Sequence, residues 1–198
     1  MADPLGKYIR VIAKYPGSIL TKTKITPDQV TIVGLLANCA AAYFIARGNL
    51  SYLMMGILIW IAGFFDALDG SVARQTGRVT KFGSFFDSVL DRYSDSVIYL
   101  GILAYFLRVA RNADYVILVT VAMMGSLAVS YVRAKAESLG LECEIGLMPR
   151  TARIVLLGAA FCIGQAFWGL LIVAVLTHLT VLQRILYVRK KLTEKADD

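Results

Sequence analysis

The chain has 198 residues, of which 58% are hydrophobic and 18% are charged, with a mean hydropathy of +0.64 and a formal net charge of +7. A soluble domain is usually about half apolar and about a quarter charged, so this composition is typical of a protein that uses the bilayer as its solvent. Nucleic-acid binding is a poor explanation for the positive charge, because a chain this apolar offers no soluble basic face.

The N-terminal segment alternates basic and apolar positions with helical spacing. Leu5, Ile9 and Ile12 would share one face of a helix, while Lys7 and Arg10 would lie largely on the other. This pattern is typical of an amphipathic helix that lies in the interface of an anionic leaflet. A disordered basic arm is the alternative.

Six apolar stretches follow, each near or above the roughly 20 residues that cross about 30 Å of hydrocarbon. They cover residues 28–46, 51–73, 82–107, 114–137, 150–166 and 168–188, and only a weak break near Gly164 divides the last two. All Lys and Arg residues then fall on one side, except Arg47, Arg108, Arg111 and the intramembrane Arg92. By the positive-inside rule, both termini face the cytosol.

We therefore predict an all-α polytopic membrane protein with six transmembrane helices in the cell membrane. The predicted divisions are an interfacial helix and linker over residues 1–25, a membrane domain over 26–190 and a charged tail over 191–198.

The first span has the signals of a helix start. Thr26 can cap the helix, Pro27 suits its first position, and Gln29 completes a capping box. The free N–H groups of this turn could also meet a phosphate, although a plain span start explains the pattern equally well.

Two pairs of acids lie at the predicted cytosolic ends of apolar spans. Asp66 and Asp69 are three residues apart, and Asp87 and Asp91 are four apart, so each pair shares a helix face. Each such charge costs about a few kcal/mol or more unless it is compensated, and Arg92 is the one nearby intramembrane cation. One or two divalent cations would balance the remaining charge, and carboxylate oxygens are the ligands that Mg²⁺ or Mn²⁺ prefers. A proton relay or ion pathway of a transporter is the alternative, which the clustering at one end disfavours.

The spacing of these acids carries a resemblance. Asp66-x-x-Asp69-Gly70-x-x-Ala73-Arg74, then eight residues, then Gly83-x-x-x-Asp87-x-x-x-Asp91 resembles the signature of the CDP-alcohol phosphotransferase family at every fixed position. Over roughly residues 20–190, the resemblance implies a six-helix, usually homodimeric membrane enzyme that opens to the cytosol. Such an enzyme transfers a phosphatidyl-type group from a CDP-linked lipid to an alcohol and releases CMP.

The resemblance also implies roles for single residues. Two metal ions, Mg²⁺ or Mn²⁺, would be held by Asp66, Asp69, Asp87 and Asp91, and Asp91 would also act as general base. The CDP-lipid would be bound by Asp28, Gln29, Val30, Thr31, Gly70, Arg74 and Thr80.

The second half of the chain carries the candidate acceptor site. Arg133, Lys135, Arg150 and Arg153 fall around one predicted cytosolic connection, and Arg184 lies at the end of the last span. These cations could form a pocket for a phosphorylated acceptor, or they could serve only as positive-inside anchors.

The run Ser-Tyr-x-Arg-Ala-Lys-Ala-Glu from Ser130, with two arginines three residues apart after a Gly-rich stretch, resembles the phosphatidylinositol phosphate synthase subfamily. This resemblance implies transfer from CDP-diacylglycerol or CDP-archaeol to inositol 1-phosphate. The acceptor would be bound by Ser130, Arg133, Lys135, Arg150, Arg153 and Arg184. Arg133 and Lys135 are swapped relative to the bacterial Lys-Ala-Arg order, which leaves an archaeal relative with archaeol lipids open. A phosphatidylglycerophosphate synthase is the near alternative, and an ion-coupled transporter the distant one.

Overall fold

The computed structural model of the chain describes residues 26–76 and 80–197, and within these ranges it leaves out the side chains of residues 27, 66–76 and 195–197. The predicted interfacial helix over residues 1–25 lies outside the described residues. The described parts contain six helices: α2 (Pro27–Arg47), α3 (Tyr52–Thr76), α4 (Lys81–Arg108), α5 (Ala113–Ser138), α6 (Arg150–Cys162) and α7 (Ala166–Asp197). Each predicted span therefore corresponds to one helix.

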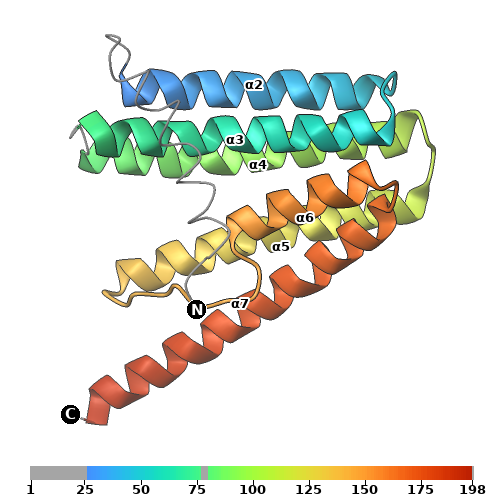
Figure 1. Cartoon of the computed structure of the whole chain (residues 1–198). Coiled ribbons are helices and arrows are strands. Elements are labelled where there is room, and N and C mark those ends of the chain that lie inside the picture. Colours follow the sequence, from blue (N-terminus) through green and yellow to red (C-terminus); the bar gives the residue numbers. More distant parts are fainter. Residues whose placement is uncertain (1–25, 77–79, 198) are drawn as a thin grey trace.

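The helices form two layers, with α2, α3 and α4 in one and α5, α6 and α7 in the other (Figure 1). Within the first layer α2 packs against both α3 and α4, and within the second α7 packs against both α5 and α6. The layers meet where α4 packs on α5 and α3 packs on α6. Their shared core includes the fully buried side chains of Ile45, Met55, Ile102, Phe106 and Phe161.

The chain reverses direction at the ends of the bundle. In Figure 1 the start of α2, the end of α3, the start of α4 and the C-terminal end of α7 lie at one end, and the α2–α3, α4–α5 and α6–α7 turns lie at the other. The start of the bundle is capped as predicted, because Thr26 Oγ1 accepts from Gln29 N and the Gln29 side chain accepts from Thr26 N at 3.0 Å. The predicted capping box is confirmed.

Helix α6 differs from the prediction in length. It ends at Cys162, where Gly164 adopts a left-handed φ of +73° that an ordinary residue would adopt only with strain. Its 13 residues span about 20 Å, whereas the hydrocarbon core is about 30 Å thick. The expectation that residues 150–166 form a full-length span is therefore wrong. In Figure 1 α6 begins partway along α5, so its first residues lie inside the bundle and not at its end.

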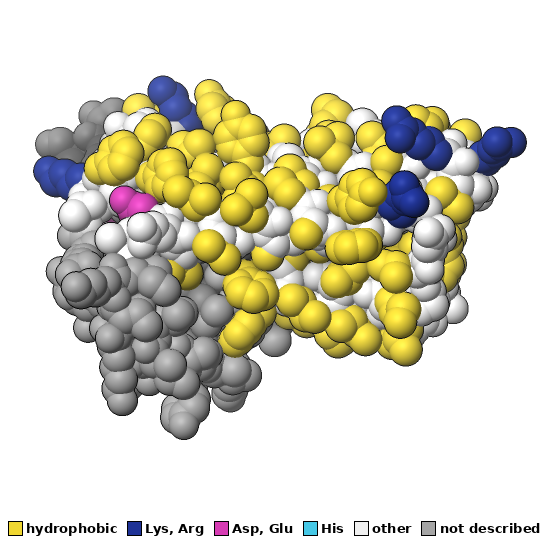
Figure 2. All heavy atoms as spheres, turned by 90° about the horizontal axis from the view of Figure 1, so that it is seen from above, with side chains coloured by type: hydrophobic (Ala, Val, Ile, Leu, Met, Phe, Trp, Pro, Cys, Tyr) yellow, Lys and Arg dark blue, Asp and Glu magenta, His cyan; other side chains and the backbone are white. Residues whose placement is uncertain are grey.

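The outer surface suits a lipid environment. Three described helices are long and apolar enough to cross a membrane by length and composition: Asp28–Arg47, Ala113–Ser138 and Ala166–Glu194. Large apolar side chains such as Leu36, Phe44 and Ile117 are exposed. Seen from above, apolar side chains cover the middle of the surface while Lys and Arg gather toward the two ends (Figure 2). An apolar face of this extent is satisfied by lipid and not by water, so the chain is a helical membrane protein.

Small residues allow the closest helix contacts, as is common between membrane helices. A Cβ added to Gly101 on α4 would lie 2.7 Å from both the Cα and the carbonyl oxygen of Ala42 on α2. A Cβ added to Gly125 on α5 would overlap Thr177 on α7. Glycine at both positions therefore sets the distance between helix axes.

We predict that Gly101→Ala lowers the thermal midpoint of the detergent-solubilised protein, because the new methyl group forces α2 and α4 apart at a cost of about 1–3 kcal/mol. The neighbouring substitution Leu100→Ala, on a half-exposed side chain, serves as the control and is expected to have a smaller effect. Equal midpoints for the two variants would contradict the close contact.

Candidate active site

The two acid pairs of the sequence motif lie at the same depth of the bundle. Asp69 lies seven residues before the end of α3, and Asp87 lies six residues after the start of α4. At a rise of 1.5 Å per residue, each is about 10 Å from the shared α3–α4 connection. Helix α2 packs against both of these helices. The carboxylates of Asp66 and Asp69, like the side chain of Arg74, lie outside the described part of the structure.

Asp87 has an unsatisfied oxygen. Its Oδ1 atom is buried and has no hydrogen-bond partner among the described residues. A buried polar atom of this kind is rare in folded proteins and calls for a specific explanation. A bound cation would supply the missing partner, so Asp87 fits the predicted metal site. The described side chains, which do not include those of Asp66 and Asp69, contain no group of three or more metal ligands.

Asp91 has a cationic partner from the other layer. Its Oδ1 atom lies 3.0 Å from Nη1 of Arg150, and Nη2 of the same arginine donates to the Asp91 carbonyl at 3.4 Å. The sequence pointed to Arg92 as the nearby cation, but Arg92 donates to the Ser88 carbonyl on its own helix. Adjacent residues on a helix do not face each other, which explains why the counter-charge of Asp91 comes from α6.

Asp95, which is not among the predicted site residues, also joins this network. Its Oδ1 accepts from Nε of Arg150 at 3.0 Å, and its Oδ2 accepts from Nη2 of Arg153 at 3.2 Å. The Arg153 side chain is only 3% exposed and that of Asp95 14%. The available signal was the spacing, because Asp95 continues the four-residue interval of Asp87 and Asp91 beyond the end of the family motif.

A small cavity lies beside this pair. Its volume is about 20 Å³, and its lining includes Asn38, Asp95, Tyr99 and Arg153. This volume is enough for about one water molecule, and the lining offers the polar partners that a buried water needs. The polar network therefore continues inward from the acids of α4.

Arg184 binds the backbone. It is 5% exposed, and it donates from Nε to the Ile145 carbonyl at 2.8 Å and from Nη1 to the Val129 carbonyl at 2.6 Å. Thr180, one turn earlier on α7, accepts from Met148 N at 3.1 Å. These bonds hold the α5–α6 connection against α7, where it returns into the bundle.

Three of the predicted acceptor residues come together around this connection. Arg133 and Arg153 both lie close enough to Arg184 to repel it electrostatically. Burial raises the pKa of the Cys143 thiol in the connection, and the guanidinium groups of Arg184 and Arg133 oppose this shift. Arg133 is exposed and pairs with Glu137 at 2.8 Å and, more distantly, with Glu144 at 3.8 Å.

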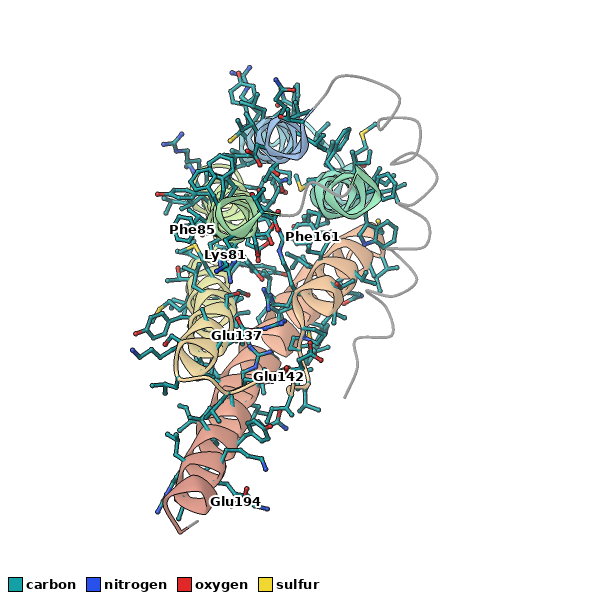
Figure 3. The ribbon with its side chains drawn as sticks, turned by 90° about the vertical axis from the view of Figure 1, so that its left-hand side faces the viewer. Lys81, Phe85, Glu137, Glu142, Phe161 and Glu194 are labelled. Carbon is teal, nitrogen blue, oxygen red and sulfur yellow. The ribbon has the colours of Figure 1, made fainter. Side chains whose placement is uncertain are left out.

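Figure 3 looks onto this end of the bundle. It shows Lys81 and Phe85 on α4 on the same side of the bundle as Glu137 on α5, with Glu142 in the connection that follows. The start of α4 and the end of α5 lie at the same end of the bundle in Figure 1. The acid pairs and the cationic cluster of Arg133, Arg153 and Arg184 therefore lie toward the same end.

Two predicted acceptor residues, Lys135 and Ser130, are not part of the cluster around Arg184. Lys135 is exposed and lines an apolar groove between α5 and α7, together with Tyr131, Ile185 and Arg189. The other predicted acceptor cations do not line this groove. Ser130 is half-buried and donates to the Ser126 carbonyl at 3.3 Å.

The residues predicted to bind the CDP-lipid lie around two helix starts. Thr80 caps α4 by accepting from Gly83 N at 2.9 Å, and a Cβ added to Gly83 would lie 3.6 Å from Oδ1 of Asp28. The N-terminal turns of α2 and α4 are thus neighbours, and such turns attract phosphate groups. Val30 and Thr31 are buried, and the Gln29 side chain takes part in the capping box.

The chain is similar to known proteins in both sequence and fold. The chain matches the CDP-alcohol phosphatidyltransferase family over residues 24–184. The chain belongs to this family. It is 37% identical over 196 residues to the archaetidylinositol phosphate synthase of Methanothermobacter thermautotrophicus, with 95% of each chain covered. It is 35% identical over 183 residues to the phosphatidylinositol phosphate synthase of Mycobacteroides abscessus, with 87% of this chain and 81% of the relative covered.

Its fold resembles that of a crystal structure of the Mycobacterium tuberculosis phosphatidylinositol phosphate synthase with CDP-DAG bound. The TM-score is 0.80 at 28% identity, over 89% of this chain and 93% of that one. A structure of the same enzyme in complex with manganese and citrate gives the same TM-score and identity, over 89% and 88%. The predicted family is confirmed, and with it the prediction that the chain is a phosphotransferase enzyme.

We predict that Arg184→Met destabilises the protein, because it leaves the buried Val129 carbonyl without its donor at a cost of about 1–3 kcal/mol and also removes the donor of the partly buried Ile145 carbonyl. The control is Arg133→Met, which removes an exposed ion pair worth about 0–1 kcal/mol. Thermal unfolding in detergent compares the two. A larger loss for Arg133→Met would contradict the anchoring role of Arg184.

Proposed function

We propose that the protein joins inositol 1-phosphate to a CDP-activated lipid, either CDP-diacylglycerol or CDP-archaeol, to form the lipid inositol phosphate and CMP. The observation that carries this proposal is the gathering of arginines next to the acids of the family motif. Arg150 forms an ion pair with Asp91, and Arg153 forms one with Asp95. Arg153 also lies near Arg184, which lies near Arg133. Like charges held this close favour a bound anion, and a phosphate monoester would supply it.

The donor would bind at the neighbouring helix starts. Asp28, Thr80 and Gly83 lie together there, and the N–H groups of two helix N-termini favour the diphosphate. We assign Gln29, Val30, Thr31, Gly70 and Arg74 to the same binding region, with Arg74 as a planar clamp for phosphate oxygens.

A divalent metal would be held by Asp66, Asp69, Asp87 and Asp91. The Oδ1 atom of Asp87, which has no hydrogen-bond partner among the described residues, supports this assignment, as does the manganese complex of the structurally similar enzyme. When bound, the metal would neutralise charge on the diphosphate and on the departing CMP. We propose Mg²⁺ or Mn²⁺ and a site for two ions.

The chain's own residues would orient the attack. An acceptor hydroxyl forms the new bond to the lipid phosphorus, the bond from that phosphorus to CMP breaks, and the hydroxyl proton passes to the Asp91 carboxylate. Arg150 orients this carboxylate through the 3.0 Å ion pair. Arg133, Arg153 and Arg184 would hold the phosphate of the acceptor, with Ser130 and Lys135 nearer its periphery.

The membrane arrangement belongs to the same proposal. We propose a membrane domain over residues 26–190 with an interfacial segment over 1–25 and a charged tail over 191–198. Both termini and the active site would face the cytosol, because the basic residues gather at the end that carries the α3–α4 connection. The functional unit would be a homodimer in the cell membrane.

We predict that the purified protein releases CMP from CDP-lipid only when inositol 1-phosphate and a divalent metal are both present. The assay uses radiolabelled acceptor in detergent and offers glycerol 3-phosphate in parallel. Turnover with glycerol 3-phosphate alone would instead make the protein a phosphatidylglycerophosphate synthase. Absence of any metal-dependent CMP release would leave the transporter alternative.

We predict that Asp91→Asn lowers turnover by at least about a hundredfold while the protein still folds, because the amide cannot accept the hydroxyl proton. The control is Asp114→Asn, which changes an exposed acid at the opposite end of the bundle. Near-normal turnover in Asp91→Asn would exclude Asp91 as the base.

A further inference from the structure

Asp95 lies one helical turn beyond the last aspartate of the family motif, and the proposed chemistry gives it no task. We infer that Asp95 is a positioning residue, which holds Arg153 in place for the anionic acceptor and holds Arg150 in place beside Asp91. The inference rests on the proposed function for the identity of the acceptor. The geometry of the ion pairs carries it.

Each oxygen of the Asp95 carboxylate binds a different arginine. Oδ1 takes Nε of Arg150 at 3.0 Å, and Oδ2 takes Nη2 of Arg153 at 3.2 Å. Both arginines come from the first turn of α6, where residues three apart share a helix face. One carboxylate therefore fixes the positions of two guanidinium groups relative to α4.

The burial of these groups makes the contact necessary. Arg153 is 3% exposed, and a buried charge is very costly without a paired acid. Asp95 is the acid that the described structure pairs with it, and the Met148 carbonyl accepts from Nη1 at 3.3 Å. These bonds use part of the donor capacity of the guanidinium, and the remaining donors can serve an oxyanion.

Arg150 extends the network to the proposed base. Its Nε is bound by Asp95 while its Nη1 is bound by Asp91 at 3.0 Å. Asp91 and Asp95 are one turn apart on the same face of α4, so a single guanidinium spans both carboxylates. Asp95 thereby couples Arg153, which would hold the acceptor phosphate, to the carboxylate of Asp91, which would take the acceptor proton.

The same contacts separate Asp95 from the metal ligands. Both of its oxygens already accept from arginine, whereas Asp87 keeps a buried oxygen without a partner in the described structure. Acids at regular spacing on one helix face thus differ in task because they differ in counter-charge.

The test is the variant Asp95→Asn, which keeps the size of the side chain and removes its charge. We expect the KM for inositol 1-phosphate to rise about tenfold or more, while the KM for the CDP-lipid stays within about twofold. The matched control is Ser96→Ala, also on α4, whose hydroxyl donates to the Arg92 carbonyl and contacts neither arginine. This control is expected to keep both KM values. An unchanged acceptor KM in Asp95→Asn, or an equal rise for both substrates, would overturn the inference.

A mutant cycle provides the second measurement, including for the case in which Asp95→Asn alone does not fold. Arg150→Gln with Arg153→Gln removes both cations that Asp95 binds, so adding Asp95→Asn to this pair is expected to change the acceptor KM by less than about threefold. A larger further rise would show that Asp95 acts independently of the two arginines and would overturn the inference. If the wild-type protein uses a different phosphorylated acceptor, the proposed acceptor is wrong, and the same cycle with that acceptor still decides the role of Asp95.

Discussion

The structure depends on ion pairs that join its two layers. Arg150 and Arg153, at the start of α6, reach the carboxylates of Asp91 and Asp95 on α4. Inside a membrane protein such charges are tolerated only when they are paired, so these contacts fix how the second layer sits on the first. The same contacts bring the cations of one layer to the acids of the other, and the active site forms where they meet.

The short α6 makes these pairs possible. A helix of full membrane length would begin at the end of the bundle and would carry its first arginines to the surface. Because α6 has 13 residues, it begins inside the bundle, at the depth of the acids. The chain must then enter the bundle without helical hydrogen bonds, which is tolerated only where its backbone groups find other partners. Arg184 and Thr180 on α7 supply such partners at Ile145 and Met148.

The three acids of α4 have different partners, and their proposed roles differ for that reason. Asp87 keeps a buried oxygen that suits a cation, Asp91 shares Arg150, and Asp95 binds two arginines. This division also explains why these arginines are not interchangeable. Arg184 holds backbone carbonyls, Arg150 holds two acids, and Arg153 combines one acid with a position beside the cationic cluster.

The sequence by itself determined the helices, the capping box at Thr26 and the family, because apolar length, local hydrogen bonding and motif spacing are all encoded in short segments. It also located the break at Gly164, since a left-handed turn has a local signature. Only the tertiary structure decided the depth of α6 and the partners of the acids. Asp91 and Arg150 are 59 residues apart in the chain, and Asp95 looked like one more polar residue beyond the motif. Pairing between distant segments depends on how the layers pack, and no local pattern in the sequence specifies it.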